Sequence, residues 1–308
     1  MIQDKPLKIS VIILTLNEER HIARCIRNLQ MLSEEIFVVD SFSTDRTCEI
    51  AESLGAHVVQ HKFVNQAQQF QWALDTLHCS GDWVMRMDAD EYLSDKLISE
   101  IRETLPALPA DVTGCNFLLD VVFLQRKLRY GRLHPPSILR LWRRGAAYME
   151  QRWMDERCVL KSGRAITLKH HFIDHNLNGL TWWTQKHNIY ASRELAVEIG
   201  RQYGLSFDSA SDMQSSRNRK KSSYYRLPLF LRALAYFSIR YILLGGFLDG
   251  RPGLIWATLQ AFWYRFLIDA KIYELKKHLG ENPSRDELLA YFQTELGIKI
   301  NHSTINKG

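Results

Sequence analysis

The segment Asp-Ala-Asp-Glu at positions 88–91 combines residue types and spacing that could do chemistry. Asp88 and Asp90 stand two residues apart, directly after the apolar segment 83–87. Carboxylate oxygens are preferred ligands of Mg²⁺ and Mn²⁺, and such a cation stabilises a diphosphate as it leaves. We therefore predict that Asp88 and Asp90 bind a divalent cation and that the two carboxylates together can reach this cation and a ribose. The alternative is a solvated acidic turn, because acidic pairs at this spacing also arise by chance.

A second acidic segment, VVDSFSTDRT at positions 38–47, contains Asp40 and Asp45. Asp40 ends an apolar run, where a carboxylate can accept hydrogen bonds from a ring N–H or a ribose hydroxyl. Asp45 precedes a helical segment, and a carboxylate near a helix N-terminus is stabilising. We predict ligand contact for Asp40 and a structural role for Asp45.

These acids need a scaffold, and the hydrophobic pattern predicts one. Short apolar runs alternate with helical segments, which is typical of a doubly wound α/β sheet. In such sheets ligands bind beyond the carboxyl ends of the strands, where Asn17, Asp40 and Asp88 are expected. The predicted strands cover residues 9–14, 36–39, 57–60 and 83–87, and the predicted helices cover 19–32, 43–54 and 66–77.

Three segments together resemble glycosyltransferase family 2 proteins of the GT-A fold. They are SVIILTLNEE (Ser10–Glu19), DSFSTD (Asp40–Asp45) and DADE (Asp88–Glu91), which occur in the family's order and spacing. The second motif departs from the family's usual Asp-Gly through Ser41 and Phe42. The resemblance covers roughly residues 9–200 and implies a metal-dependent hexosyltransferase that uses a nucleotide sugar, a UDP-sugar.

The resemblance also implies roles for individual residues. Asp88 would lie by the ribose or the metal, and Asp90 would bind the metal, Mg²⁺ or Mn²⁺. The residues expected to hold the nucleoside are Thr15, Asn17, Glu18 and Asp40.

An inverting transferase needs a general base that deprotonates the acceptor hydroxyl. The family places an acidic residue downstream of the DxD motif for this purpose, and the candidates are Asp155 and Glu156. The resemblance favours Glu156. The alternative is a surface ion pair with Arg152 or Arg157.

An aromatic and polar segment, predicted to be helical over residues 181–199, resembles a segment of family 2 enzymes that build lipopolysaccharide core or exopolysaccharide. Lys186 and His187 could neutralise a phosphate of the donor or acceptor, and Trp182 or Trp183 could stack on a sugar. The alternative, equally weighted, is a helix that packs its tryptophans into the core.

Two other polar groups have simpler interpretations. The histidines of HHFIDHN, positions 170–176, have no further ligand set in the sequence, so packing is favoured over metal binding. Arg140 and Arg143 either meet a phosphate or lie in solvent.

The net charge of +6 is unevenly distributed. Residues 217–277 hold twelve Lys and Arg but three Asp and Glu, a balance of +9, which indicates an anionic partner. Within this block, the segments 227–244 and 254–275 are apolar helices with narrow charged stripes, joined by a Gly/Pro-rich turn. That pattern favours an interfacial hairpin on an anionic membrane. The alternatives are packing on the catalytic domain and a dimer interface.

The predicted organisation is an α/β, GT-A-type doubly wound nucleotide-sugar-binding domain with a C-terminal amphipathic helical hairpin. The predicted boundaries are 1–205 for the catalytic domain, 206–223 for a basic linker, 224–277 for the hairpin and 278–308 for a C-terminal helix and tail.

The resulting hypothesis is an inverting glycosyltransferase that moves a sugar from a nucleotide-sugar donor to a lipid-linked saccharide or a lipopolysaccharide or exopolysaccharide acceptor. The N-terminal residues lack the apolar run of a signal peptide, and the five cysteines form no CxxC pair. The expected location is therefore the cytoplasmic side of a bacterial inner (plasma) membrane, as a peripheral protein.

Three rival functions have specific objections. A nucleotidyltransferase would need a Gly-rich, basic loop after the first strand, which TLNEERH lacks. A nucleic-acid-binding protein is disfavoured because the basic block lies among strongly apolar helices. An inactive membrane scaffold is disfavoured by the intact Asp88 and Asp90.

Overall fold

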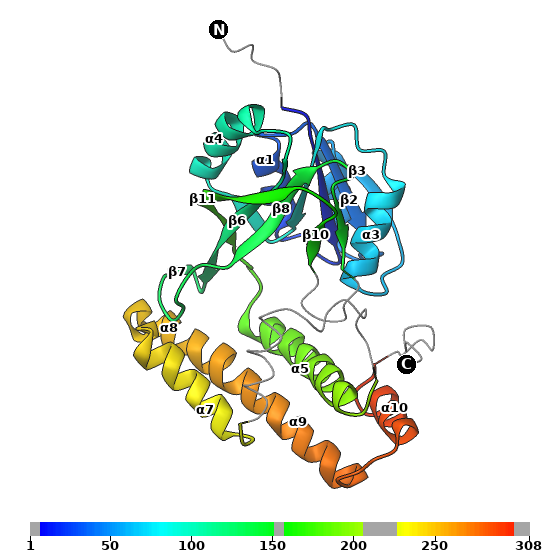
Figure 1. Ribbon diagram of the computed structural model, residues 1–308, viewed down its shortest axis with the longest axis vertical. Coiled ribbons are helices and arrows are strands. Elements are labelled where there is room, and N and C mark those ends of the chain that lie inside the picture. The colour runs from blue at the N-terminus through cyan, green and yellow to red at the C-terminus, as the bar shows by residue number, and fades with distance from the viewer. Residues whose placement is uncertain (1–6, 151–156, 206–226, 299–308) are drawn as a thin grey trace. The chain divides into compact units, whose positions relative to one another are not determined.

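The computed structural model describes residues 7–150, 157–205 and 227–298. They divide into two compact units, which are described separately below (Figure 1). The first unit covers 1–128, 134–150 and 156–177, and the second covers 129–133, 151–155 and 178–308. The predicted linker, 206–223, lies outside the described residues.

The first unit is built on a mixed β-sheet with the strand order β3-β2-β1-β4-β8-β6-β11-β5 and with β7 paired to β6. Its first four strands are parallel, as the alternating pattern predicted. They are β1 (Ile9–Thr15), β2 (Glu35–Asp40), β3 (His57–Gln60) and β4 (Trp83–Asp88). The helices between them are α1 (Ile22–Leu29), α2 (Thr47–Ser53) and α3 (Gln66–Thr76).

The remaining part of this sheet mixes directions. Strand β8 runs antiparallel to both β4 and β6, whereas β11 runs parallel to β6 and antiparallel to β5. These elements are β5 (Glu91–Leu93), α4 (Asp95–Thr104), η1 (Leu105–Ala107), β6 (Val112–Phe123), β7 (Arg126–Leu128), β8 (Ser137–Arg143) and β11 (Arg164–Asp174). A separate two-stranded ribbon pairs β9 (Ala147–Met149) with β10 (Cys158–Leu160).

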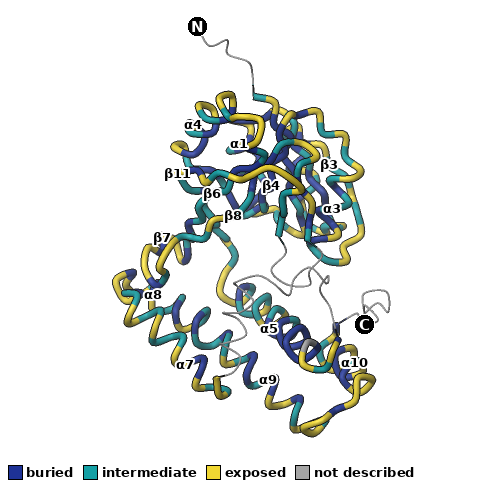
Figure 2. Tube along the Cα trace, in the orientation of Figure 1, coloured by how far each residue is buried: buried dark blue, intermediate teal, exposed yellow. Residues whose placement is uncertain are grey.

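Alternate residues of β1 show how the layers form. Val11 and Ile13 belong to the core that includes α1 and α4, whereas Ile12 belongs to the core that includes α3. Successive strand residues point to opposite faces, so helices cover both faces of the sheet, and Figure 2 shows the central strands as largely buried. The α/β fold class is confirmed.

The second unit is helical. Its core joins α5 to α9 and α10, through buried residues such as Leu195, Ile268 and Phe292. A capping box formed by Ser284 and Glu287 begins α10. The helices are α5 (Leu180–Gln202), α7 (Leu231–Ser238), η3 (Ile239–Leu243), η4 (Gly246–Asp249), α8 (Gly250–Trp256), η5 (Ala257–Trp263), α9 (Tyr264–Leu279) and α10 (Arg285–Thr294).

Helix α5 shows why the units divide before residue 205, the end predicted for the catalytic domain. Its apolar face packs on α9, so the structure groups it with the later helices. The predicted apolar hairpin is present as α7 with η3, a turn, and α8 continuing through η5 into α9. Among the described helices, none has the length and hydropathy to cross a bilayer by itself. The bent pair Leu231–Leu243 and Gly246–Leu279, with a 68° bend, meets that criterion jointly.

Candidate active site

The carboxyl ends of β1, β2 and β4 meet at one edge of the sheet. Thr15 pairs with Asp40 across β1 and β2, and Leu14 pairs with Asp88 across β1 and β4. Three of the residues predicted to contact the donor, Thr15, Asp40 and Asp88, therefore converge there.

Asp40 is fully buried and anchors the loop that follows β2. Its carboxylate accepts hydrogen bonds from Thr15 Oγ1 at 2.9 Å and from the backbone N–H of Ser43 at 2.7 Å. Burial would raise the pKa of Asp40, but the hydrogen bonds from Ser43 and Thr15 lower it below the ordinary value. Asp40 is therefore ionised at neutral pH and fixes the backbone of the loop at the strand edge. The ligand contact that we predicted for Asp40 stays a prediction.

Asn17 joins the loop after β1 to the loop after β2. It has a positive φ of 57°, a conformation that Asn adopts more readily than most residues. Its backbone N–H donates to Ser43 Oγ at 2.8 Å, and its Oδ1 accepts from the Thr44 N–H at 2.8 Å. Asp45 accepts from the Thr47 N–H at 3.0 Å, at the start of α2, which is the structural role predicted for it.

Glu18 is tied to the segment that follows β11. Its Oε2 lies 2.6 Å from Nδ1 of the buried His21, whose Nε2 accepts the Leu177 N–H at 2.8 Å. Because Nε2 is an acceptor, the ring proton that faces Glu18 is on Nδ1. The side chain of Glu18 is 17% exposed. Its carboxylate therefore orients His21, which in turn binds the backbone at Leu177.

Asp88 sits above a buried ion pair. Arg140 Nη2 lies 2.5 Å from Glu91 Oε1 and 3.5 Å from Asp88 Oδ2, and Glu91 Oε2 accepts the Asp88 N–H at 2.9 Å. Burial disfavours the charge of Arg140, but the carboxylates of Glu91 and Asp88 raise its pKa above the ordinary value. The side chain of Asp88 is 32% exposed. The sequence predicted that Arg140 contacts a phosphate or lies in solvent. In the structure it is buried and lies beside the carboxylates of Glu91 and Asp88.

Asp90 is held by two residues that the sequence did not single out. Asn176 Nδ2 donates to Asp90 Oδ2 at 2.9 Å. Arg24 Nη2 donates to the Asp90 carbonyl at 2.9 Å and to the His175 carbonyl at 2.7 Å, and the His175 N–H donates to the same Asp90 carbonyl at 3.0 Å. The only sequence signal for these contacts was the polar segment 170–176. Its last residues form hydrogen bonds with Asp90, in the turn that contains Asp88 and Asp90.

The donor chemistry of Asp88 and Asp90 fits a divalent cation. No cluster of three or more His, Cys, Asp or Glu residues suited to a metal occurs in the described parts of the chain. Mg²⁺ is usually bound by one or two carboxylates, with water and substrate phosphates completing the octahedron. Two partly exposed carboxylates at the edge of the sheet match that arrangement.

The other predicted site residues lie elsewhere or outside the described residues. Asp155 and Glu156 fall within 151–156, which the structure does not describe. Lys186 and His187 lie on α5, in the second unit.

The tryptophans of α5 distinguish the two interpretations of that helix. Trp183 is 8% exposed and packs against Trp256 and Trp263. His187 stacks on Trp183 with ring centroids 3.5 Å apart, and burial lowers its pKa. Trp183 thus packs in the core, while Lys186 Nζ lies 4.5 Å from the centroid of the Trp182 ring.

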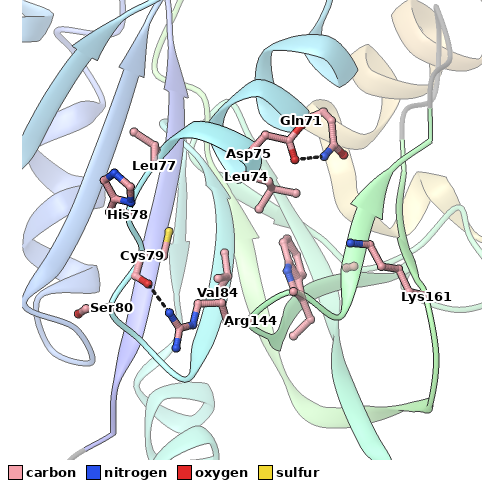
Figure 3. A pocket seen from close by; sticks show the side chains of 13 residues that line it. Gln71, Leu74, Asp75, Leu77, His78, Cys79, Ser80, Val84, Arg144 and Lys161 are labelled. Carbon is pink, nitrogen blue, oxygen red and sulfur yellow. Dashed lines mark hydrogen bonds between the residues drawn. The ribbon is translucent and has the colours of Figure 1, made fainter.

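A cavity of about 440 Å³ opens on the first unit at the opposite end of β4 (Figure 3). Arg144 lies beside it and donates to the Cys79 carbonyl at 3.1 Å. Val84 lines this cavity near the start of β4, whereas Asp88 ends the strand, roughly 13 Å further along. The cavity is therefore separate from the strand-edge site.

Known proteins match this chain to different extents. The profile described as Glycosyl transferase family 2 matches residues 10–168. Uncharacterized glycosyltransferases of Rickettsia bellii and Rickettsia typhi are 46% and 44% identical over 94 residues, 30% of this chain. The match spans 31% and 32% of their lengths, about a third of these curated relatives.

Another relative matches along most of the chain. The lipopolysaccharide core biosynthesis glycosyltransferase LpsC of Rhizobium meliloti is 27% identical over 297 residues, which is 92% of this chain and 98% of LpsC. Among solved structures, glucosyl-3-phosphoglycerate synthase from Mycobacterium tuberculosis in complex with Mn²⁺, UDP and glucosyl-3-phosphoglycerate has a TM-score of 0.32 and 25% identity. That similarity covers 37% of this chain and 44% of the synthase.

Proposed function

Since the chain belongs to glycosyl transferase family 2, with the GT-A-type α/β fold that the sequence predicted, we propose that it is an inverting glycosyltransferase. It moves a sugar from a nucleotide sugar, a UDP-sugar, to a lipid-linked saccharide in lipopolysaccharide core or exopolysaccharide assembly. The observation that carries the proposal is the pair of braced carboxylates, Asp88 and Asp90, at the same sheet edge as the Asp40 loop. The similarity to LpsC along most of the chain supports the acceptor class.

Donor binding is assigned to the strand edge. Asn17 joins the loops that follow β1 and β2, and Asp40 holds them at the strand edge. In this proposal Thr15, Asn17 and Glu18 bind the nucleoside. Asp88 and Asp90 would hold a Mg²⁺ or Mn²⁺ ion, whose positive charge would offset the charge of the leaving diphosphate. On the protein side, Asn176 orients the Asp90 carboxylate, and Arg140 limits the repulsion between Asp88 and Glu91.

The transfer step is a single displacement. The acceptor oxygen forms a bond to the anomeric carbon while the bond from that carbon to the diphosphate oxygen breaks, and the diphosphate keeps the electron pair. The acceptor's proton passes to a carboxylate, Glu156 or Asp155, which acts as general base.

Membrane docking is part of the proposal, on the cytoplasmic side of the inner membrane. The hairpin buries charge and exposes apolar side chains, the reverse of an ordinary soluble helix pair. Arg232 and Asp269 are 2% and 1% exposed and form an ion pair, whereas Leu231 and Leu234 are 62% and 52% exposed. A lipid-linked acceptor would then lie in the surface to which the enzyme binds.

The direct test is thermal unfolding of the full chain with UDP or UDP-sugars, with and without Mn²⁺, because a ligand of the native state raises the unfolding temperature. We expect UDP with Mn²⁺ to stabilise the protein more than either alone, and Asp90→Asn to abolish that synergy. The matched control is Asp75→Asn, an exposed carboxylate of α3, which should keep it. Equal stabilisation by UDP with and without metal, in wild type and Asp90→Asn alike, would contradict the proposed site.

A further inference from the structure

The turn of the hairpin carries a cluster of exposed apolar side chains. Leu243 is 76% exposed, Phe247 50%, Leu248 52% and Leu254 43%. They lie at the end of η3, in η4 and in α8, within 12 residues of one another in sequence. We name residues 243–254 the hairpin apex.

A loop from another part of the sequence is fastened to this apex. Residues 129–133, which connect β7 to β8, belong to the second unit. The buried carboxylate of Asp249 accepts the Arg129 N–H at 3.0 Å and the Tyr130 N–H at 3.0 Å. The Gly131 N–H donates to the Leu244 carbonyl at 2.9 Å.

Arg240 completes the attachment through its Nε, which donates to the Gly131 carbonyl at 2.6 Å. Gly131 has a φ of +75°, and a Cβ there would lie 3.2 Å from the Arg240 carbonyl oxygen. A side chain at this position would be strained by the positive φ and crowded by that oxygen. Three consecutive residues of the loop thus have their backbone N–H groups satisfied by the apex, so the loop and apex form one body.

The attached loop adds apolar and basic side chains to the same surface. Tyr130 is 44% exposed and Leu133 is 78% exposed. Tyr130 Cδ1 lies 3.8 Å from the position of a Cβ at Gly245, so its ring lies over the turn of the hairpin. Arg129 on the loop and Arg251 on the apex are both exposed.

We propose that residues 129–133 and the hairpin apex together form the element that inserts into the headgroup region of an anionic phospholipid bilayer. The inference rests on the membrane docking included in the proposed function, and it specifies which part of the chain enters the lipid. The loop contributes Tyr130 and Leu133 as apolar anchors, and Arg129 with Arg251 meets the phosphates.

The composition of the patch selects a bilayer as the occupant. Large apolar side chains mixed with arginine on one small surface are typical of interfacial membrane binding, and basic residues near anionic lipid add attraction. Residues 227–277 hold seven Lys and Arg and three Asp and Glu, a balance of +4, which disfavours a second copy of the same basic surface because like charges repel. The bent helix pair that meets the length and hydropathy criterion contains this apex.

Flotation of the full chain with vesicles tests the proposal. The vesicles are phosphatidylglycerol with phosphatidylethanolamine, and phosphatidylcholine as the neutral comparison, at low and high salt. The double variant Tyr130→Ser/Leu133→Ser should weaken partitioning onto anionic vesicles by about tenfold, because two apolar side chains no longer leave water. Arg129→Gln should weaken it only at low salt, since salt screens the attraction.

The control is Tyr273→Ser/Ile189→Ser, which also removes one tyrosine and one aliphatic side chain; they are 50% and 53% exposed, against 44% and 78% for Tyr130 and Leu133. Tyr273 lies 19 residues beyond Leu254, the last residue of the apex, along contiguous helical segments, which corresponds to roughly 28 Å. The control should change partitioning by no more than about twofold.

Each outcome decides a different point. If wild type floats and the loop variant floats equally well, the loop is not an insertion element, and membrane docking by the hairpin stands. If the control loses as much binding as the loop variant, the apex has no special role. If wild type ignores every vesicle, both the docking and this inference fail; sedimentation that shows a dimer for wild type and a monomer for the loop variant would then assign the patch to a second copy.

Discussion

The strand-edge site and the helical hairpin use buried charge for different purposes. At the strand edge, buried Glu91 and Arg140 lie beneath the partly exposed Asp88 and orient it. In the hairpin, Arg232 and Asp269 are paired with each other, while the exposed side chains around them are apolar. Buried charge therefore supports a polar working surface in one unit and lies beneath an apolar surface in the other.

This contrast determines what each region tolerates. Replacing a carboxylate at the strand edge should change the chemistry and leave the fold, because the sheet's apolar core lies beneath the site. Replacing one partner of the hairpin ion pair should change the fold, because the remaining charge has no access to water.

The largest expected effect is on the general base. Glu156→Gln or Asp155→Asn should lower the rate of sugar transfer by roughly 10²–10⁴-fold while UDP and Mn²⁺ still stabilise the protein. The measurement is UDP release with an acceptor saccharide. We expect the loss in one of the two variants, and near wild-type rates in both would place the base at another residue.

The hairpin ion pair should give the largest effect on stability. Arg232→Met leaves Asp269 buried and unpaired, with its Oδ2 still accepting the Phe230 N–H at 2.7 Å, and should cost about 3–5 kcal/mol in the free energy of unfolding. The double variant Arg232→Met/Asp269→Leu should recover much of that loss, because no isolated charge is left.

Urea unfolding followed by circular dichroism measures both variants. As a comparison, Arg46→Met removes an exposed arginine that pairs with Glu49 on the surface, and should leave the urea midpoint nearly unchanged, because exposed ion pairs contribute little to stability. A single Arg232→Met variant as stable as wild type would contradict the contrast drawn between the two units.

A smaller effect, on the metal requirement, is expected from Asn176, which holds the Asp90 carboxylate in position. Asn176→Ala removes the donor that orients Asp90 Oδ2, and groups that orient a metal ligand are worth roughly 10–100-fold in metal affinity. The Mn²⁺ concentration for half-maximal activity should rise by that factor, while the rate at saturating metal falls less. Asn188→Ala, at an exposed position of α5, should leave it unchanged; a loss of rate without any change in metal requirement would assign Asn176 a different role.

The parts of the fold that depend on local sequence pattern could be predicted, whereas the parts that depend on pairing between distant segments could not. Strands β1, β2 and β4 are buried parallel strands, which read as continuous apolar runs, so the positions of Asp40 and Asp88 at their ends were predicted from local pattern. The order of the later strands was not predicted, since β11 pairs with β6 through register shifts that no local pattern encodes.

The hydrogen bonds and ion pairs that hold the site residues in place could not be predicted from local patterns either. Arg24 reaches the Asp90 carbonyl across 66 positions in the chain, and Asn176 reaches Asp90 across 86. In the hairpin, Arg232 and Asp269 are 37 positions apart. A single sequence shows each of these as a polar residue on a helix or in a loop, and only the folded chain shows its partner.

The smallest expected effect is the pH dependence of the Asp40 loop, which sharpens the comparison because this buried charge is satisfied by neutral donors. The folded-state pKa of Asp40 is lowered: burial alone would raise it, but hydrogen bonds from Ser43 and Thr15 outweigh burial. A carboxylate with a lowered pKa contributes stability that is fully present above its unfolded-state pKa of about 3.9 and is lost as the pH falls through the folded-state value. As the pH falls below about 4, the unfolding temperature of wild type should therefore decrease more steeply than that of Asp40→Asn. Asp75→Asn, an exposed position of α3, should keep the wild-type slope, and an identical slope for Asp40→Asn would mean that the loop does not depend on the ionised carboxylate.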